Sequence, residues 1–322
     1  MRHWEGVNVE LTRLGPDAGS PAEWNLEDAQ AYCHVVARSH YENFPLLLGL
    51  LPVDLRTPFA SIYAWCRWAD DLGDEVDGAD RSLDLLKWWR EELERCYQGC
   101  ARHPVTVSLS PVVAHYGLDQ SLFRHLIEAF EQDQVVTDYE TFDQLEAYCR
   151  RSANPVGRLV LGLIGVADNR LLSASDAICT GLQLANLWQD VARDHRAGRV
   201  YLPAEDRGRF GYEDRHLAAE ETNEAFVALM QFEIDRTRSM LASGWGLADD
   251  LAGWRIPVVV DLFARGGVGI LNRIESIGCR VWEHRPLIRK RDVTRMLLAA
   301  LCRRGLRRLR RSGAHAWKTQ QP

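Results

Sequence analysis

The spacing of apolar residues predicts helices along almost the whole chain. After Pro58, a favourable first-turn residue, apolar side chains recur every three or four positions, which is the period of one helix face. Runs that alternate between apolar and polar residues, as strands would require, are nearly absent. The pattern therefore predicts an all-α fold. Further helices are expected at about 25–39, 82–98, 119–131, 141–150, 156–167, 174–195, 221–242, 256–264, 267–279 and 291–311.

Glycine and proline mark the expected ends of these helices. In residues 1–24, Gly15, Pro16, Gly19 and Pro21 predict an irregular N-terminal leader. The segments expected to interrupt helices are 99–105, 152–157, 197–203 and 266–269. Since the chain has no 20–50-residue repeat and no low-complexity linker, we expect one helical domain over 25–290 rather than a solenoid. A basic amphipathic helix and tail follow at 291–322.

Composition narrows the classes of protein that fit this pattern. Apolar residues make up 46% of the 322 residues, enough for a substantial core, but no run reaches the roughly 20 residues of a membrane span. The first residues lack the features of a secretory signal. The eight cysteines are scattered without a zinc pattern, as expected for reduced, buried thiols in a cytoplasmic protein.

Charge is distributed unevenly along the chain. Residues 285–322 hold 12 Lys/Arg and one acid, a balance of +11, which leaves −17 for residues 1–284. An acidic body argues against nucleic acid as a partner, because phosphate contacts need clustered bases. The basic end has two interpretations: a helix in peripheral contact with anionic lipid on the inner face of the membrane, or a packing helix whose charged tail aids solubility. Its bases include Arg303, Arg304, Arg307, Arg308, Arg310 and Arg311.

The first candidate motif is the acidic segment 67–75. On a helix, Asp70 and Asp74 lie one turn apart on the same face. Like charges at this spacing cost about 0.2–0.5 kcal/mol per pair unless a cation is present. Taken alone, the segment is more typical of a solvated acidic turn.

A second motif, on another predicted helix, favours a metal site. Gln183, Asn186, Asp190 and Asp194 follow one another at intervals of three, four and four residues, while apolar residues cover the other faces. Such a polar stripe is typical of a wet cavity. Two facing Asp pairs can hold Mg²⁺ between the protein and a diphosphate. A di-iron site would need Glu-x-x-His motifs, which these helices lack, and we interpret His195 as a surface residue.

Together the motifs resemble those of the squalene/phytoene synthase family. The resemblance rests on Arg67 with Asp70-Asp71-x-x-Asp74-Glu75, on the stripe from Gln183 to Asp194, and on Arg199-x-Tyr201-x-Pro203, and it covers about residues 26–285. It implies a single-domain class I isoprenoid-synthase helical bundle with a central cavity and Mg²⁺ as cofactor. The metal ligands that it implies are Asp70, Asp74, Asn186, Asp190 and Asp194.

The resemblance also implies residues that contact the isoprenoid diphosphate. Arg67 would assist the four aspartates in catalysis, and Gln183, Arg199 and Tyr201 would help to hold the diphosphate. His40, Asn43 and Phe44 belong to an early segment near the diphosphate. Aromatic faces stabilise carbocations, and Phe44, Tyr63 and Trp188 are candidates, although aromatic residues at helical spacing are more often plain core.

Within the family, four segments resemble the bacterial hydroxysqualene synthase branch, which acts in hopanoid-type squalene supply: 42–45, 152–158, 186–190 and 265–271. Arg151 stands where squalene synthases carry a tyrosine that is implicated in condensing two farnesyl diphosphates. The resemblance thus implies an enzyme that receives presqualene diphosphate from a separate synthase. It would ionise this substrate and let water capture the rearranged cation, giving hydroxysqualene and diphosphate.

Two alternatives remain open. The first is a head-to-head prenyltransferase that makes presqualene diphosphate, squalene or phytoene, against which Arg151 argues. The second is a non-catalytic relative that serves as an assembly factor, in which eroded aspartate motifs would be expected. A terpene cyclase would lack the Arg-x-Tyr-x-Pro segment.

Overall fold

The computed structural model describes residues 6–19, 23–39 and 49–318, with side chains up to residue 305. Over these ranges the only β pairing is an isolated bridge between Asp138 and Val200, so the expected all-α fold is confirmed. No helix in the described part is both long and apolar enough to cross a bilayer. The helices are α1 (Val7–Leu14), α2 (Leu26–Ser39), α4 (Val53–Asp74), α5 (Ala79–Tyr97), α6 (Pro104–Tyr116), α7 (Gln120–Gln132), α8 (Phe142–Ser152), α9 (Asn154–Gly162), α10 (Asn169–Gln189), α11 (Val191–Arg196), α12 (Ala204–Arg209), α13 (Asp214–Ala218), α14 (Glu224–Gly244), α15 (Leu247–Asp250), α16 (Arg255–Ser276) and α17 (Lys290–Lys318).

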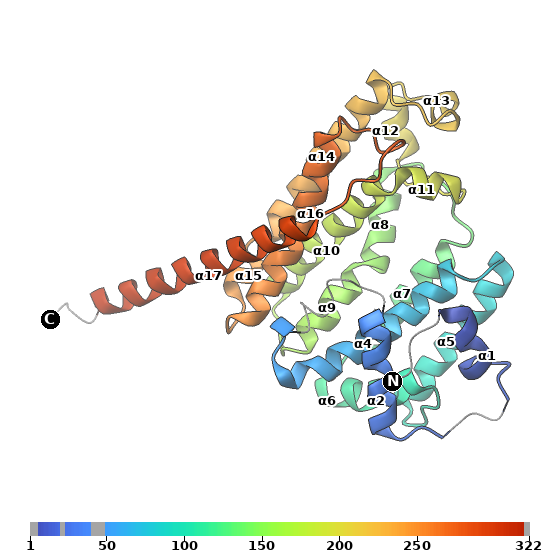
Figure 1. The fold of residues 1–322 in the computed structure, drawn as a ribbon, viewed down its shortest axis with the longest axis vertical. Coiled ribbons are helices and arrows are strands. Elements are labelled where there is room, and N and C mark those ends of the chain that lie inside the picture. Colours follow the sequence, from blue (N-terminus) through green and yellow to red (C-terminus); the bar gives the residue numbers. More distant parts are fainter. Residues whose placement is uncertain (1–5, 20–22, 40–48, 319–322) are drawn as a thin grey trace.

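Two groups of helices meet along one seam (Figure 1). Helix α4 packs on α2, α5, α6 and α7, and helix α10 packs on α8, α9, α14 and α16. The buried apolar side chains form two clusters, and the one around α4 extends into α9 and the first half of α10, so that it joins the two groups. The long helix α17 contacts α16 and then projects away from the rest of the molecule. The seam between α4 and α10 therefore brings together the two segments that carry the aspartate motifs.

A cluster of tryptophans fills the core beside α4. The Trp68 and Trp89 rings stack with centroids 5.4 Å apart, and Trp65 lies 6.0 Å from Trp89. Stacked and edge-on aromatic pairs contribute about 0.5–1.5 kcal/mol beyond the area they bury. The cluster fixes α4 against α5, and so sets the position of the first aspartate motif.

The His103 ring lies within this cluster and should make stability depend on pH. Burial lowers its pKa from 6.5 to about 3, whereas the unfolded chain protonates it near 6.5. The contribution of His103 to the free energy of unfolding is therefore fully present above pH 6.5. It decreases as pH falls from 6.5 toward 3, by up to about 1.4 kcal/mol per pH unit, because the unfolded state binds a proton that the folded state excludes. His103→Asn keeps an acceptor at the start of α6 and should flatten this slope between pH 6.5 and 4.5 in urea unfolding. The control is His284→Asn, at an exposed histidine, and equal slopes in the two variants would refute the assignment.

Glycines allow α10 to approach its neighbours unusually closely. A Cβ atom built on Gly181 would lie 2.7 Å from Leu241 on α14, and one on Gly244 would lie 2.5 Å from the Ala174 carbonyl oxygen on α10. On the other side, a Cβ atom on Gly157 of α9 would lie 2.4 Å from Ser175 Oγ. Any larger side chain at these positions would force the helices apart.

The structure differs from the sequence prediction in four elements. The expected irregular leader contains helix α1, which buries Val7 and Glu10 against the body. Helix α4 begins five residues before Pro58, which lies inside it. Helix α6 was missed because it is buried and apolar on most faces, which removes the amphipathic signal. Residues 266–269 do not break α16, since their glycines pack closely: a Cβ on Gly267 would lie 3.0 Å from Leu182, and Met296 packs against Gly269.

Candidate functional site

A cavity of about 550 Å³ lies between α4, α7, α8, α9 and the α10–α11 segment. It brings together the described residues that the sequence nominated for the site, with the exception of Trp188. The nominated residues that line it are Tyr63, Arg67, Asp70, Asp74, Gln183, Asn186, Asp190, Asp194, Arg199 and Tyr201. His40, Asn43 and Phe44 lie outside the described residues.

One wall of the cavity is the last two turns of α4. Arg67 pairs with Asp70 at 3.1 Å and also with Asp71, whose side chain is only 2% exposed. Burial is the main cause that raises the pKa of Asp70 to about 6, and the nearby charge of Asp74 adds to it. Burial likewise raises the pKa of Asp71 to about 7. Asp71 does not line the cavity, so its place is behind Arg67, where it orients the guanidinium toward the cavity.

The opposite wall is the junction of α10 and α11. The helix is interrupted at Asp190, so Asn186 reaches the cavity from the end of α10, Asp194 from the six-residue helix α11, and Asp190 from the junction between them. Arg285, from the loop before α17, holds Asp190 with two hydrogen bonds, one of 2.9 Å. Burial, followed by the charge of Asp190, raises the pKa of Asp194 to about 7.

Arg199 joins the two walls. Its guanidinium pairs with Asp74 at 3.0 Å across the mouth of the cavity. Gly198, with φ of 80°, makes the turn that follows α11, and Val200 then bridges to Asp138. The two aspartate motifs, more than a hundred residues apart in sequence, thus face each other across one opening.

The lining residues that were not nominated from the sequence include Asp133, Tyr148 and Arg193. Asp133 accepts hydrogen bonds from the Tyr148 hydroxyl at 2.8 Å and from the Tyr201 hydroxyl at 3.0 Å. Burial raises the pKa of Asp133 to about 7. Nothing in the local sequence distinguishes Asp133 from an ordinary polar residue at a helix end.

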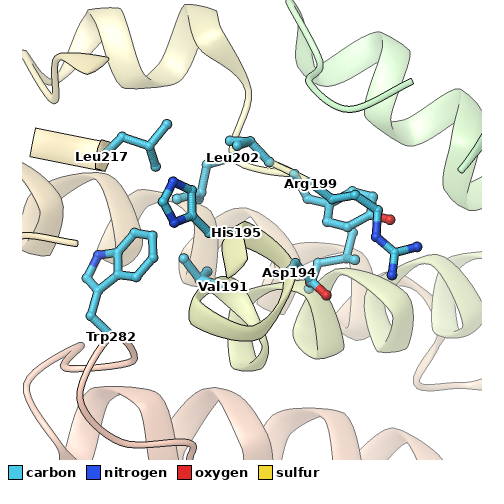
Figure 2. Close-up of a pocket in the computed structure, with 10 residues that line it drawn as sticks. Val191, Asp194, His195, Arg199, Leu202, Leu217 and Trp282 are labelled. Atoms are coloured by element: carbon cyan, nitrogen blue, oxygen red, sulfur yellow. The ribbon is translucent and has the colours of Figure 1, made fainter. Parts of the chain in front are cut away.

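His195 was interpreted as a surface residue, and the structure shows it as half-buried, with 25% of its side chain exposed. Figure 2 shows its ring beside Trp282 and Leu217, away from the Asp194 and Arg199 side chains. The His195 and Trp282 ring centroids are 5.3 Å apart, edge to face. The cavity that these residues help to line measures only about 10 Å³, too small for a substrate. His195 therefore packs beside Trp282 and does not line the larger cavity.

Apolar side chains also line the cavity. Leu126, Phe130, Val156 and Leu187 line it, together with the aromatic face of Tyr63. Burial raises the pKa of Tyr63 to about 12, so its hydroxyl stays protonated at neutral pH. Trp188, the other described aromatic candidate, is fully buried elsewhere, and its Nε1 donates to Thr237 Oγ1 at 2.8 Å. Trp188 is thus a core residue and does not face the cavity.

The donor set of the cavity suits Mg²⁺. Five aspartates line the cavity beside three arginines, leaving a surplus of hard oxygen ligands. Among the described residues, no three His, Cys, Asp or Glu side chains converge closely enough to hold a metal by themselves. Mg²⁺ commonly binds through one or two carboxylates, with waters and substrate phosphate oxygens completing its octahedral shell. The two walls, separated as they are, fit this mode of binding.

Comparison with known proteins identifies relatives over most of the chain. A sequence model described as squalene/phytoene synthase matches residues 37–295. The chain is 34% identical over 224 residues to a phytoene synthase of Arthrospira platensis, covering 66% of this chain and 72% of that protein. It is 30% identical over 295 residues to a 15-cis-phytoene synthase of Synechocystis sp., covering 87% and 86%.

Solved structures share the fold. The squalene synthase HpnC from Alicyclobacillus acidocaldarius is 38% identical, with a TM-score of 0.75 over 79% of this chain and 95% of that one. A dehydrosqualene synthase has a TM-score of 0.76 over 85% and 96%, but its 22% identity bears on the fold alone.

Proposed function

This chain belongs to the squalene/phytoene synthase family, and on that premise we propose that it ionises presqualene diphosphate with Mg²⁺ and lets water capture the cation, releasing hydroxysqualene and diphosphate. The observation that carries the general chemistry is one cavity lined by two opposed aspartate walls and by apolar side chains. This polarity matches an isoprenoid diphosphate, which has a charged head and a long hydrocarbon body.

Arg67 and Arg199 would hold the diphosphate at the mouth. In the absence of ligand they pair with Asp70 and Asp74, at 3.1 and 3.0 Å. Asp70, Asp74, Asn186, Asp190 and Asp194 would hold Mg²⁺, which neutralises charge on the leaving diphosphate when it is bound. Since the arginines and the metal ligands are interleaved, a metal–diphosphate complex would draw the carboxylates to the metal and leave the guanidiniums for phosphate oxygens.

The reaction breaks the C–O bond to diphosphate and forms a C–O bond to water. The rearranged cation would lie in the apolar interior, where the face of Tyr63 offers electrostatic stabilisation of about 0.5–2 kcal/mol. The proton released by water would pass to the departing diphosphate. No protein side chain is therefore assigned as general base.

Two observations support this branch of the family. The first is the 38% identity to a structure whose description names a squalene synthase, HpnC. The second is Arg151, in place of the expected tyrosine. Its Nη2 donates to Gln132 Oε1 at 2.6 Å, and Arg151 is absent from the residues that line the cavity. The residue associated with the first condensation is thus replaced by one bonded elsewhere.

A head-to-head condensation is the second candidate, because the curated relatives with 30–34% identity are phytoene synthases. Product analysis separates the two. Purified protein with Mg²⁺ is incubated with farnesyl, geranylgeranyl or presqualene diphosphate, and the products are identified by mass spectrometry in normal and ¹⁸O-labelled water.

We expect labelled hydroxysqualene from presqualene diphosphate and no product from the two linear substrates. Conversion of farnesyl or geranylgeranyl diphosphate alone would overturn the hydroxysqualene assignment and retain the family. Turnover of none of the three, by folded protein, would favour the non-catalytic assembly factor.

A further inference from the structure

Helix α17 has an inner face that is fixed to the body of the protein. Ala300 is buried, and Arg303 pairs with Asp249 at 2.6 Å and with Asp261 at 2.9 Å. Arg304 donates to backbone carbonyls of the 248–253 segment. These two arginines, which the sequence grouped with the lipid-facing bases, instead anchor the helix.

The outer face of α17 combines exposed apolar and basic side chains. Leu298 and Leu301 are 56% and 39% exposed, and the Cys302 thiol is exposed beside them. Arg291 and Arg295 are exposed on the same stretch of helix, about two turns and one turn before Leu298, respectively. Large apolar side chains exposed next to bases are typical of a surface that contacts an interface rather than bulk water.

A second cavity, of about 500 Å³, lies between α10, α16 and α17. The α17 residues that line it, Val293 and Met296, lie on the opposite side of the helix from Arg295 and Leu298, since successive residues turn by about 100°. The exposed outer face of α17 is therefore separate from this cavity.

We propose that the outer face of α17 docks on an anionic lipid bilayer. The distribution of charge indicates which partner would contact this face. Residues 285–322 carry +11 while the rest of the chain carries −17, so an anionic surface attracts this end alone and repels the body. A second copy docking through the same face in a symmetric dimer would bring two basic helices together, which is unfavourable.

Docking itself does not depend on the reaction proposed above.

The test uses the full chain and a fluorophore sensitive to polarity. In a Cys100→Ser background the label is attached to Cys302, on the docking face, and in a Cys302→Ser background to Cys100, which is exposed in the α5–α6 loop. Vesicles of phosphatidylcholine, with or without 30% phosphatidylglycerol, are titrated at low and high salt. We expect a blue shift only for the Cys302 label, only with anionic vesicles, and reduced by salt.

Charge reversal provides the matched comparison. Arg291→Glu with Arg295→Glu should raise the lipid concentration for half-maximal binding about tenfold or more, because each base near the surface contributes to attraction. Arg215→Glu, at an exposed arginine on α13, should leave it unchanged. Circular dichroism confirms that the variants fold.

Three results would overturn the proposal: equal binding to neutral and anionic vesicles, equal binding by the charge-reversed and control variants, or a blue shift from the Cys100 label as well. Concentration-dependent cross-linking through Cys302 without vesicles would also overturn it and identify the face as an interface between copies.

Discussion

Replacing Asp190 by Asn is expected to lower kcat for the isoprenoid diphosphate by about 10³-fold or more while the helical fold is retained. Asp190 lies at the junction of α10 and α11, where its carboxylate faces the cavity mouth. An amide has the same shape but carries no charge, so it would weaken metal binding and the neutralisation of the leaving diphosphate. A metal site contributes several kcal/mol to such a transition state, and about 4 kcal/mol corresponds to 10³ in rate. Steady-state kinetics and circular dichroism measure the two effects.

The matched control is Asp84→Asn, an exposed aspartate on α5 outside the cavity, which should keep full activity. Asp70→Asn, on the other wall, should resemble Asp190→Asn. Activity near the wild-type level in either wall variant would remove the basis for the metal assignment.

Removing divalent metal is expected to abolish both turnover and the binding of inorganic diphosphate. Diphosphate at about 100 times its Kd would stabilise the folded state by about 2.7 kcal/mol, a rise in Tm of several degrees. The rise should appear with Mg²⁺ and vanish with EDTA, because the carboxylates at the mouth would otherwise repel the anion. Differential scanning fluorimetry measures it without any turnover.

In Asp70→Asn and Asp190→Asn the Mg²⁺-dependent rise in Tm should be lost, whereas Asp84→Asn should keep it. If diphosphate raised Tm equally in EDTA, then Arg67, Arg199 and Arg285 would suffice to bind it, and the aspartates would not act through a metal.

The candidate site was predictable where its residues form a pattern along one helix. Asp70 and Asp74 repeat at one turn, and the stripe from Gln183 to Asp194 continues across a break in the helix without losing its face. Helical periodicity alone places such residues on one side, and the tertiary fold then brings the two sides together.

Residues that act from isolated positions left no such signal. Asp133 reaches the cavity from the end of α7, and Arg285 reaches Asp190 from a loop 95 residues later. Asp71 stands beside Asp70 in the motif, yet helix geometry turns it into the core, where it orients Arg67. His195 shows the same limit, since only the position of Trp282 determines its surroundings.

Helix α6 and the continuity of α16 were not predicted, because they too depend on contacts between distant parts of the chain. Amphipathic helices such as α5 and α7 can be predicted from the spacing of their apolar residues. Helix α6 is buried on most faces, so its sequence is a nearly continuous apolar run without that spacing. The glycines of α16 signal a break in isolation, whereas here they are required by close neighbours on α10, α14 and α17.

The glycine contacts of α10 also bear on how the molecule can move. With no space at Gly157, Gly181 or Gly244, the helix cannot rotate or slide against α9 and α14 without breaking those contacts. Opening and closing around a ligand must then fall to α11, the Arg199 turn and the loop that carries Arg285, which are joined to the opposite residues by ion pairs. In this architecture α10 is the fixed side of the site, and we expect any movement to occur in the segments that carry Arg199 and Arg285.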